Sequence, residues 1–414
     1  MKILIIHEVL GALAGAEQNI LLSGTALKER GNQLYMAYDR QSDKRVLEFD
    51  NIFTETYQIS FSQDNRGAKE SIRELISTLN PDIVYAHKLM SLPILSELVI
   101  SGKPLVRMIH DHDTYCIRSY RYSPYSRKIC TRKIGLYCLF PCLGCLKRDR
   151  SKSISVAYVS LLEKMKELEF SKKFDNIFVV TNYMKDEFLR QDFDPDKVHI
   201  FPPVPKANNE PFQSSFSDDN VILYVGQIIR GKGVDCLIKS LACVKTEFKA
   251  YIIGDGSHLE YCMKLAKKLG VDERIVFTGW VDQSQLHEYY KDATLVTVPS
   301  VWPEPIATIG LEVLRYGLPV VGFDSGGISD WLIDGQTGFL IDWMDITGFS
   351  LAIDKLLIDK SLARQLGEQG REFVNIEYDF EQYIDRMEKQ FEVLCTEKNN
   401  CTQSIPSLKP SMYI

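Results

Sequence analysis

The stretch that decides the fold runs from Leu295 to Phe323 and reads LVTVPSVWPEPIATIGLEVLRYGLPVVGF. Two short apolar runs, Leu295–Val298 and Val320–Phe323, flank a segment with a helical pattern. We expect this helix to start near Pro305, because proline is favoured at the first helical position. A strand, a crossover helix and a second strand form a right-handed unit of a parallel sheet.

The same alternation of buried strands and amphipathic helices fills two blocks of the chain. It predicts an α/β protein with two Rossmann-like domains, each a doubly wound parallel sheet, facing each other across a cleft. The strands expected in the first block are Ile3–Ile6, Gln33–Tyr38, Ile83–Tyr85, Leu105–Ile109 and Ile177–Val180. Those expected in the second block are Ile222–Val225, Ala250–Ile253, Ile275–Phe277, Leu295–Val298 and Val320–Phe323.

The domain boundary is expected in the Pro- and Asn-rich segment that starts at Phe201. This gives an N-terminal domain of residues 1–205 and a C-terminal domain of residues 206–377. Residues 396–414 lack periodicity and are expected to be a loose tail. Ligands of doubly wound sheets bind outside the carboxyl ends of the strands, so the cleft between the domains is the expected site.

Composition excludes several classes of protein. The chain has 414 residues, with 45% hydrophobic and 25% charged residues, which is typical of a globular protein. Its 49 basic and 55 acidic residues give a net charge of −6, which argues against a nucleic-acid footprint along the whole chain. Apolar runs fall short of the ~18 residues of a membrane span, and the four apolar residues after Lys2 are too few for a signal peptide. We therefore expect a cytoplasmic protein whose ten cysteines are reduced.

Two carboxylates in the opening stretch are candidate ligand-binding groups. Glu304 lies just before the expected helix and Glu312 about two turns into it, so they would meet different parts of one elongated ligand. The backbone N–H groups of Ile306, Ala307 and Thr308 would form an anion site at the helix start. The alternative is an ordinary helix cap and a surface glutamate.

Small-residue loops follow several of the expected strands. Gly226 to Gly233 contains three glycines with Arg230 and Lys232, which suits a close approach to a phosphate group. Gly254-Asp255-Gly256 follows the next strand, and a loop that ends at Gly15 follows the first strand of the chain. All of these loops are expected to face the cleft.

Together these motifs resemble the retaining glycosyltransferase family 4, also called group 1, which has the GT-B fold. The resemblance covers the second block in order and spacing, and the first block more loosely. Its motifs in the second block are Gly226 with Lys232-Gly233, Gly254-Asp255-Gly256, Phe277-Thr278-Gly279-Trp280-Val281, Pro299-Ser300, Glu304 with Glu312, Gly317-Leu318-Pro319-Val320, Gly326-Gly327 and Asp334 to Gly338. Those in the first block are Gly15-Ala16-Glu17, His110-Asp111 and Val179 to Glu187.

The resemblance implies transfer of a sugar, with retention, from a nucleotide-diphosphate donor to a glycan or lipid-linked acceptor in polysaccharide or glycolipid biosynthesis. It implies that Lys232 and Arg230 neutralise the diphosphate, that Glu304 and His110 contact the transferred sugar, and that Glu312 binds the ribose. UDP- and GDP-sugars are the expected donors, and no catalytic metal is expected. The residues expected to bind the donor are Gly15, Gly226, Gly254, Asp255, Gly256, Val281, Ser300, Ile306, Ala307, Thr308 and Glu312.

Two features qualify this interpretation. Gln227 stands where many relatives have arginine, and Arg230 is expected to supply the charge instead. Asp111-His112-Asp113 spells the Asp-x-Asp of metal-dependent glycosyltransferases of the other fold, which we interpret as coincidence. The resemblance also implies that a helix over residues 378–395 crosses back to the N-terminal domain. The alternatives are a nucleotide-sugar epimerase or a phosphorylase of the same architecture, and an inactive scaffold.

Residues 113–152 form an insert with unusual chemistry. Cys130, Cys138, Cys142 and Cys145 are spaced closely enough for a structural zinc site or an iron–sulfur cluster, with Cys116 as a substitute ligand. The alternative is a set of buried free thiols. From Cys116 to Lys152 there are ten Lys or Arg residues and one acidic residue, with tyrosines interleaved. This predicts a surface for an anionic partner, either a lipid diphosphate carrier or the inner face of a membrane, or alternatively a solvated basic face.

Overall fold

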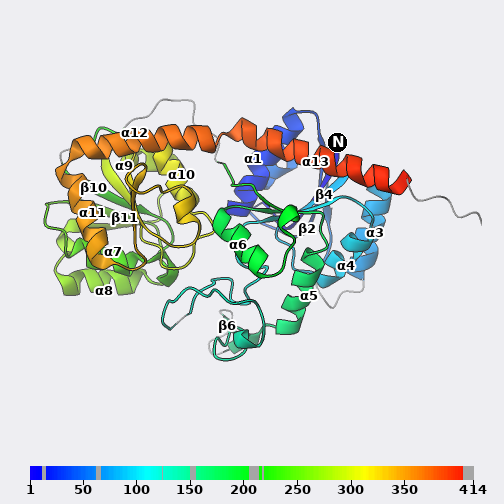
Figure 1. Ribbon diagram of the computed structural model, residues 1–414, viewed down its shortest axis with the longest axis horizontal. Coiled ribbons are helices and arrows are strands. Elements are labelled where there is room, and N and C mark those ends of the chain that lie inside the picture. Colours follow the sequence, from blue (N-terminus) through cyan, green and yellow to red (C-terminus); the bar gives the residue numbers. More distant parts are fainter. Residues whose placement is uncertain are drawn as a thin grey trace, which may run out of the picture.

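The computed structural model describes residues 1–11, 15–61, 67–123, 125–149, 155–204, 214–216 and 219–403. Two α/β domains lie side by side, each built on a parallel sheet with helices packed against it (Figure 1). The expected domain boundary after residue 205 and the part of the expected tail from residue 404 onward lie outside the described residues, whereas residues 396–403 are helical and the prediction of a loose tail is wrong for them. None of the helices in these ranges is long and apolar enough to cross a membrane.

The N-terminal sheet has seven strands in the order β3-β2-β1-β4-β5-β8-β9, and all neighbours are parallel. Its strands are β1 (Lys2–Leu10), β2 (Gln33–Gln41), β3 (Glu55–Gln58), β4 (Ile83–Ala86), β5 (Leu105–Ile109), β8 (Asn176–Val179) and β9 (Val198–Ile200). Its helices are α1 (Gly15–Glu29), α2 (Val46–Asp50), α3 (Gly67–Leu79), α4 (Leu92–Ile100), α5 (Leu161–Ser171) and α6 (Asn182–Arg190).

The C-terminal sheet has six parallel strands in the order β12-β11-β10-β13-β14-β15. Its strands are β10 (Val221–Val225), β11 (Lys249–Ile253), β12 (Ile275–Gly279), β13 (Ala293–Val298), β14 (Val320–Phe323) and β15 (Gly338–Ile341). Its helices are α7 (Val234–Leu241), α8 (Leu259–Leu269), α9 (Leu286–Asp292), α10 (Thr308–Arg315), α11 (Ile346–Ile358) and α12 (Lys360–Glu377).

The central strands are apolar on both faces, as strands covered by helices on both sides must be. Residues Ile3–Ile6 of β1 and every residue of β4 and β13 are buried. All ten strands predicted from the sequence are present, and the predicted doubly wound architecture is confirmed in both domains. The short edge strands β3, β9 and β15 were not predicted, since three or four partly exposed residues leave too little apolar pattern to find.

The long C-terminal helix α13 (Phe380–Gln403) follows α12 and lies against α1 of the N-terminal domain. Arg30 at the end of α1 forms ion pairs with three carboxylates of α13, and Asn19 donates to the Tyr383 hydroxyl at 2.9 Å. Figure 1 shows α12 and α13 running in succession along one side of both domains. The chain therefore passes between the domains a second time at this point.

The insert leaves the end of β5 and returns at the start of α5. It contains a short helix, η1 (Leu136–Cys138), and an antiparallel hairpin of β6 (Leu146–Asp149) and β7 (Ser155–Tyr158). Ile117, Cys145 and Leu161 form a small core of their own, apart from the cores of the two domains. In Figure 1 the insert lies on the side of the molecule opposite α12 and α13.

Candidate active site

The loops after β10, β11 and β12 interlock at the carboxyl edge of the C-terminal sheet. The Gly226 amide donates to the Ile253 carbonyl at 3.0 Å, and the Gly254 amide donates to the Gly279 carbonyl at 2.9 Å. Gly254 has a φ of +135°, and a Cβ there would overlap the Gly226 carbonyl, so only glycine fits. The predicted glycine loops are thus brought together, with Asp255 exposed beside them and bonded to the Gly256 amide at 2.6 Å.

The phosphate loop, which we define as residues 226–233, ends in a tight turn into α7. Arg230–Lys232 form a short helix (η3), and Gly233 follows in the left-handed region with a φ of +70°. A side chain on Gly233 would overlap the Pro299 carbonyl, which explains the glycine before α7. Arg230 is exposed and donates to the Tyr125 carbonyl of the insert at 3.4 Å. Gln227 is also exposed.

Glu304 is a buried carboxylate with three donors on one oxygen. Its Oε1 accepts from Lys232 Nζ at 2.8 Å, from Trp302 Nε1 at 2.6 Å and from the Ser300 hydroxyl at 2.5 Å. The side chain of Glu304 is only 3% exposed, whereas that of Lys232 is 24% exposed. The structure therefore joins three residues predicted from the sequence, Lys232, Ser300 and Glu304, and adds Trp302.

The predicted anion site at the start of α10 has a different shape from the expected one. The helix begins at Thr308, three residues later than Pro305, and Ala307 has a left-handed backbone with a φ of +56°. The Pro305 carbonyl accepts from Thr181 and the Ile306 carbonyl from Trp331, so tertiary contacts hold both residues outside the helix. Ile306 and Ala307 are buried, and only Thr308 of the three is exposed.

Glu312 lies one helical turn into α10 and points toward α9. Tyr290 donates its hydroxyl proton to Glu312 Oε1 at 3.1 Å, and burial raises the pKa of Glu312. On the loop after β12, Trp280 is 80% exposed and Val281 is partly buried. A large exposed aromatic ring is a surface on which a nucleotide base can stack.

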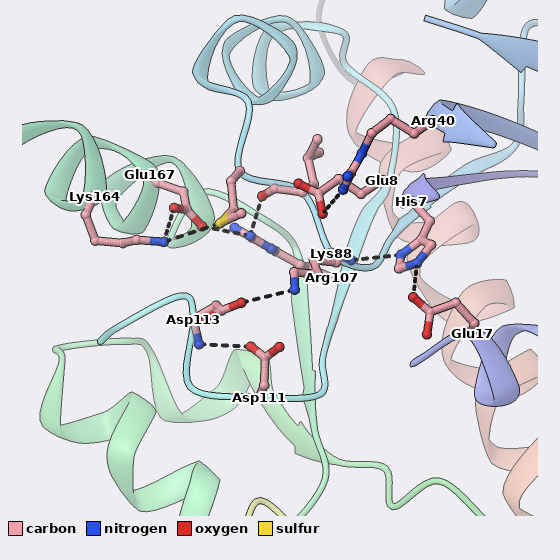
Figure 2. Close-up of polar contacts among 12 residues, drawn as sticks. His7, Glu8, Glu17, Arg40, Lys88, Arg107, Asp111, Asp113, Lys164 and Glu167 are labelled. Atoms are coloured by element: carbon pink, nitrogen blue, oxygen red, sulfur yellow. Dashed lines mark hydrogen bonds and ion pairs between the residues drawn. The ribbon is translucent and has the colours of Figure 1, made fainter. Parts of the chain in front are cut away.

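The N-terminal side of the site is built from titratable side chains rather than glycines. His110 follows β5, and its Nε2 lies 3.0 Å from Nδ1 of His87, which follows β4. Burial lowers the pKa of His110 to about 3, so its ring is neutral at physiological pH. Next to this pair, His7 Nε2 contacts Glu17 of α1 at 3.0 Å (Figure 2). Gly15 begins α1 and is exposed.

Asp111 and Asp113 lie beside these histidines, close enough for their carboxylates to interact. The Asp113 amide donates to Asp111 Oδ1 at 2.9 Å, and Lys88 Nζ pairs with Asp113 Oδ2 at 3.3 Å (Figure 2). Burial and the neighbouring Asp113 charge raise the pKa of Asp111 to about 6. The pKa of Asp113 is lowered, because its bonds to Ser119 and Lys88 outweigh its burial.

A cavity of about 270 Å³ opens beside this pair, between α5 and the insert. Asp113, Ser119, Ser160 and Lys164 supply both donors and acceptors to its wall. Glu167, also in the wall, pairs with Lys164 at 2.6 Å and with Arg107 at 3.0 Å. A cavity lined in this way suits a ligand that carries hydroxyl groups.

His112 is a contact between the domains that sequence reasoning missed. Its Nε2 lies 2.7 Å from the Pro303 carbonyl, directly before Glu304, and its Nδ1 lies 2.6 Å from the Tyr115 hydroxyl. A carbonyl only accepts, so Nε2 carries the proton and Nδ1 accepts from Tyr115. Burial lowers the pKa of His112 to about 4, which keeps the ring neutral. The only signal in the sequence was its place between two aspartates.

The five cysteines of the insert are free thiols in the structure. Cys116, Cys130, Cys138 and Cys142 are partly buried and free, and they are close enough for their charges to interact. Cys145 is buried in the small core with Ile117 and Leu161, and Cys138 packs against this core. Within the part of the chain that the structure describes, no three His, Cys, Asp or Glu side chains are placed to hold a metal ion. A zinc or iron–sulfur site therefore stays a prediction, which elemental analysis of the purified protein tests.

Comparison with known proteins places these features in a class. Two facing Rossmann-like domains define the GT-B architecture of glycosyltransferases. HepE of Anabaena, solved with UDP and glucose, superimposes with a TM-score of 0.71 at 16% identity, over 95% of this chain and 100% of HepE. The apo form of the lipopolysaccharide outer core galactosyltransferase WaaB gives a TM-score of 0.69 at 17% identity, over 96% of this chain and 100% of WaaB.

The C-terminal domain has a more specific assignment. Residues 206–373 match the family model of glycosyl transferases group 1. The lipopolysaccharide core biosynthesis glycosyltransferase LpsE of Rhizobium meliloti is 33% identical over 156 residues, 38% of this chain and 45% of LpsE. The lipopolysaccharide 1,2-N-acetylglucosaminetransferase of Salmonella typhimurium is 31% identical over 186 residues, 42% of this chain and 48% of the relative. The chain thus spans about half the length of these curated relatives.

Proposed function

We propose that this protein is a retaining glycosyltransferase that moves a sugar from a nucleotide-diphosphate donor to a hydroxyl group of a glycan or lipid-linked acceptor. The observation that carries the proposal is the buried Glu304 carboxylate, held 2.8 Å from Lys232 beside the phosphate loop. This arrangement offers a cation for a leaving diphosphate and a fixed acceptor for sugar hydroxyls in one place.

Each side chain has a role that follows from its position. Lys232 and the exposed Arg230 neutralise the negative charge that grows on the diphosphate as the sugar leaves, which is electrostatic catalysis. Glu304 accepts from hydroxyls of the donor sugar, Glu312 binds the ribose, and Trp280 and Val281 face the base. The leaving phosphate assists removal of the proton from the acceptor hydroxyl, and the proposal assigns no catalytic metal.

His110 acts on the transferred sugar as a neutral imidazole. Because burial holds its pKa near 3, it exchanges hydrogen bonds without carrying charge at neutral pH. The acceptor would lie in the cavity lined by Asp113, Ser119 and Lys164. Closure of the two domains would exclude water, since hydrolysis of the donor is the competing reaction.

The donor is tested by binding. UDP, GDP, ADP and CDP and their sugars are compared by thermal shift and calorimetry, and turnover is followed with the donor that binds. We expect one nucleoside diphosphate to stabilise the protein, with UDP and GDP favoured, because HepE was solved with UDP and a mannosyltransferase relative from Mycolicibacterium smegmatis is GDP-mannose-dependent by name. An epimerase would convert its nucleotide sugar without an acceptor, a phosphorylase would show pyridoxal absorbance, and a scaffold would bind without turnover.

We also propose that the acceptor is presented at an anionic membrane surface and that the insert contacts this surface. Side chains that surround its small core are strongly exposed although apolar, with Leu136 at 80%, Phe140 at 78% and Tyr158 at 69%. Exposed bases such as Lys128 and Arg132 lie on the same insert. Apolar side chains among basic residues bind a bilayer that contains anionic lipid.

Vesicle flotation tests the membrane contact. The protein should float with vesicles containing phosphatidylglycerol and remain in solution with phosphatidylcholine alone. The double substitution Leu136→Ser with Phe140→Ser should abolish flotation. Leu47→Ser is the matched control, because Leu47 is 79% exposed in α2 and lies outside the insert. Equal flotation of all variants would show that the insert does not contact the membrane.

A further inference from the structure

The insert of the N-terminal domain is fixed to both domains by buried arginines. Arg121 pairs with Glu187 of α6 in its own domain, through Nε at 2.6 Å. Arg127 pairs with Asp235 of α7 in the other domain, with its two terminal nitrogens 3.1 Å from Oδ1 and Nη2 also 3.0 Å from Oδ2. The side chains of Arg127 and Asp235 are 10% and 4% exposed, so this pair is closed off from water.

Asp235 connects the ion pair to the phosphate loop. It lies in the first turn of α7, two residues after Gly233 and three after Lys232. Its other basic neighbours, Lys239 Nζ and His258 Nε2, are both 3.9 Å away, so Arg127 is the closest basic partner of its carboxylate. A displacement of Arg127 therefore acts directly on a residue in the first turn of α7.

The same segment of the insert touches the site at two further points. The Tyr125 carbonyl accepts from Arg230, and the Tyr120 ring lies 5.5 Å from the Trp302 ring. Trp302 in turn donates to Glu304. Arg121 and Arg127 both have left-handed backbones, with φ values of 55° and 61°, a conformation that non-glycine residues adopt only when their surroundings hold them there.

We propose that the insert is a latch between the domains and that Arg127 is a positioning residue, which holds the phosphate loop in the geometry that binds a diphosphate. The inference rests on the proposed function for its ligand, whereas its structural part, the restraint of the loop, does not. Separating the domains would break the pair of Arg127 with Asp235, and breaking a buried ion pair is strongly unfavourable. The pair therefore favours the arrangement in which loop and insert are together.

Binding of two related ligands tests this role. Arg127→Ala should weaken binding of the nucleoside diphosphate by about tenfold, within the range for residues that act on a site through a neighbouring element. Binding of the free nucleoside should stay unchanged, because the base and ribose do not contact the loop. Arg127→Lys, with one point charge instead of a bidentate fork, should fall between. The exchange Arg127→Asp with Asp235→Arg should restore part of the lost affinity. Equal losses for nucleoside and diphosphate would overturn the role.

Hydrogen exchange of the ligand-free protein tests the latch without any nucleotide. Amides of residues 226–237 should exchange faster in Arg127→Ala than in the parent protein, whereas amides of β4 and β5 should not change. Lys133→Ala is the matched control, since Lys133 is exposed in the same insert and pairs with Asp192 of its own domain, at 2.6 Å. Unchanged exchange in the loop would overturn the latch. Faster exchange in a protein that binds no nucleotide would keep the latch and refute the proposed function.

Discussion

The two sheets share one topology of parallel strands, yet different types of residue lie at their carboxyl edges. The edge of the C-terminal sheet carries glycines, whose backbones interlock and approach one another closely, with one buried ion pair, Lys232–Glu304. The edge of the N-terminal sheet carries buried histidines and carboxylates. One edge is suited to a large anion, the other to neutral hydroxyl groups. Under the proposed function, this difference assigns donor binding to one edge and acceptor binding to the other.

The largest effect is expected at the charged edge. Lys232→Ala should lower turnover by about 1000-fold and donor affinity much less, because its charge matters most as the diphosphate leaves. Steady-state kinetics with the donor that binds measure both values. The control is Lys264→Ala, an exposed lysine of α8 paired with Glu260. Normal turnover in Lys232→Ala would end the assignment of the phosphate loop.

A smaller effect is expected at the edge of the N-terminal sheet. His110→Ala should lower turnover by about 100-fold, as loss of one oriented hydrogen bond in the transition state does, while nucleoside diphosphate affinity stays the same. Calorimetry with the diphosphate and kinetics with the nucleotide sugar separate the two values. If His110→Ala lowered diphosphate affinity as strongly as it lowers turnover, the assignment of the diphosphate to the C-terminal edge alone would be wrong.

Glu312→Ala tests the donor side without touching the reaction. Loss of a buried carboxylate that accepts from the ribose should weaken nucleotide binding by about tenfold. A deoxyribose analogue of the nucleotide should lose little further affinity in this variant. Tyr290→Phe, which removes only the hydroxyl that donates to Glu312, is the control for rearrangement of the carboxylate. Unchanged affinity in Glu312→Ala would assign the ribose to another residue.

The smallest effect is expected for the pH dependence of stability, through His112 at the contact between the two domains. The pKa of His112 is about 4 when folded and ordinarily about 6.5, so between these values only the unfolded chain binds the proton. The contribution of His112 to the free energy of unfolding is therefore fully present above pH 6.5 and is lost as the pH falls toward 4. Urea unfolding at pH 7 and pH 5 should show a smaller loss for His112→Gln than for the parent protein. His287→Gln, at an exposed histidine, should behave like the parent.

Most of the fold could be predicted from the sequence because its signals are local. Buried central strands such as β4 and β13 consist of consecutive apolar residues, and the glycine loops have fixed spacing. The start of α10 could not be predicted, because Thr181 and Trp331, distant in sequence, bind the carbonyls that would otherwise lie in its first turn.

The site divides in the same way. Lys232, Ser300 and Glu304 were predicted and lie together, although they come from two separate loops. His112 and the pair of Arg127 with Asp235 could not be found, because each depends on how one domain meets the other. The place of Cys145 in a small apolar core likewise depends on Ile117 and Leu161, which spacing between cysteines does not reveal.

The path of the chain between the domains has a mechanical consequence. The chain crosses between the domains where α12 ends and α13 begins, and the insert lies on the opposite side of the molecule (Figure 1). The crossing between α12 and α13 acts as a hinge, and the ion pair of Arg127 with Asp235 holds the insert to the other domain. An ion pair far from a hinge acts at the end of a long lever arm, where a small force resists a large torque. A single ion pair placed there controls the opening angle more effectively than the same pair placed beside the hinge.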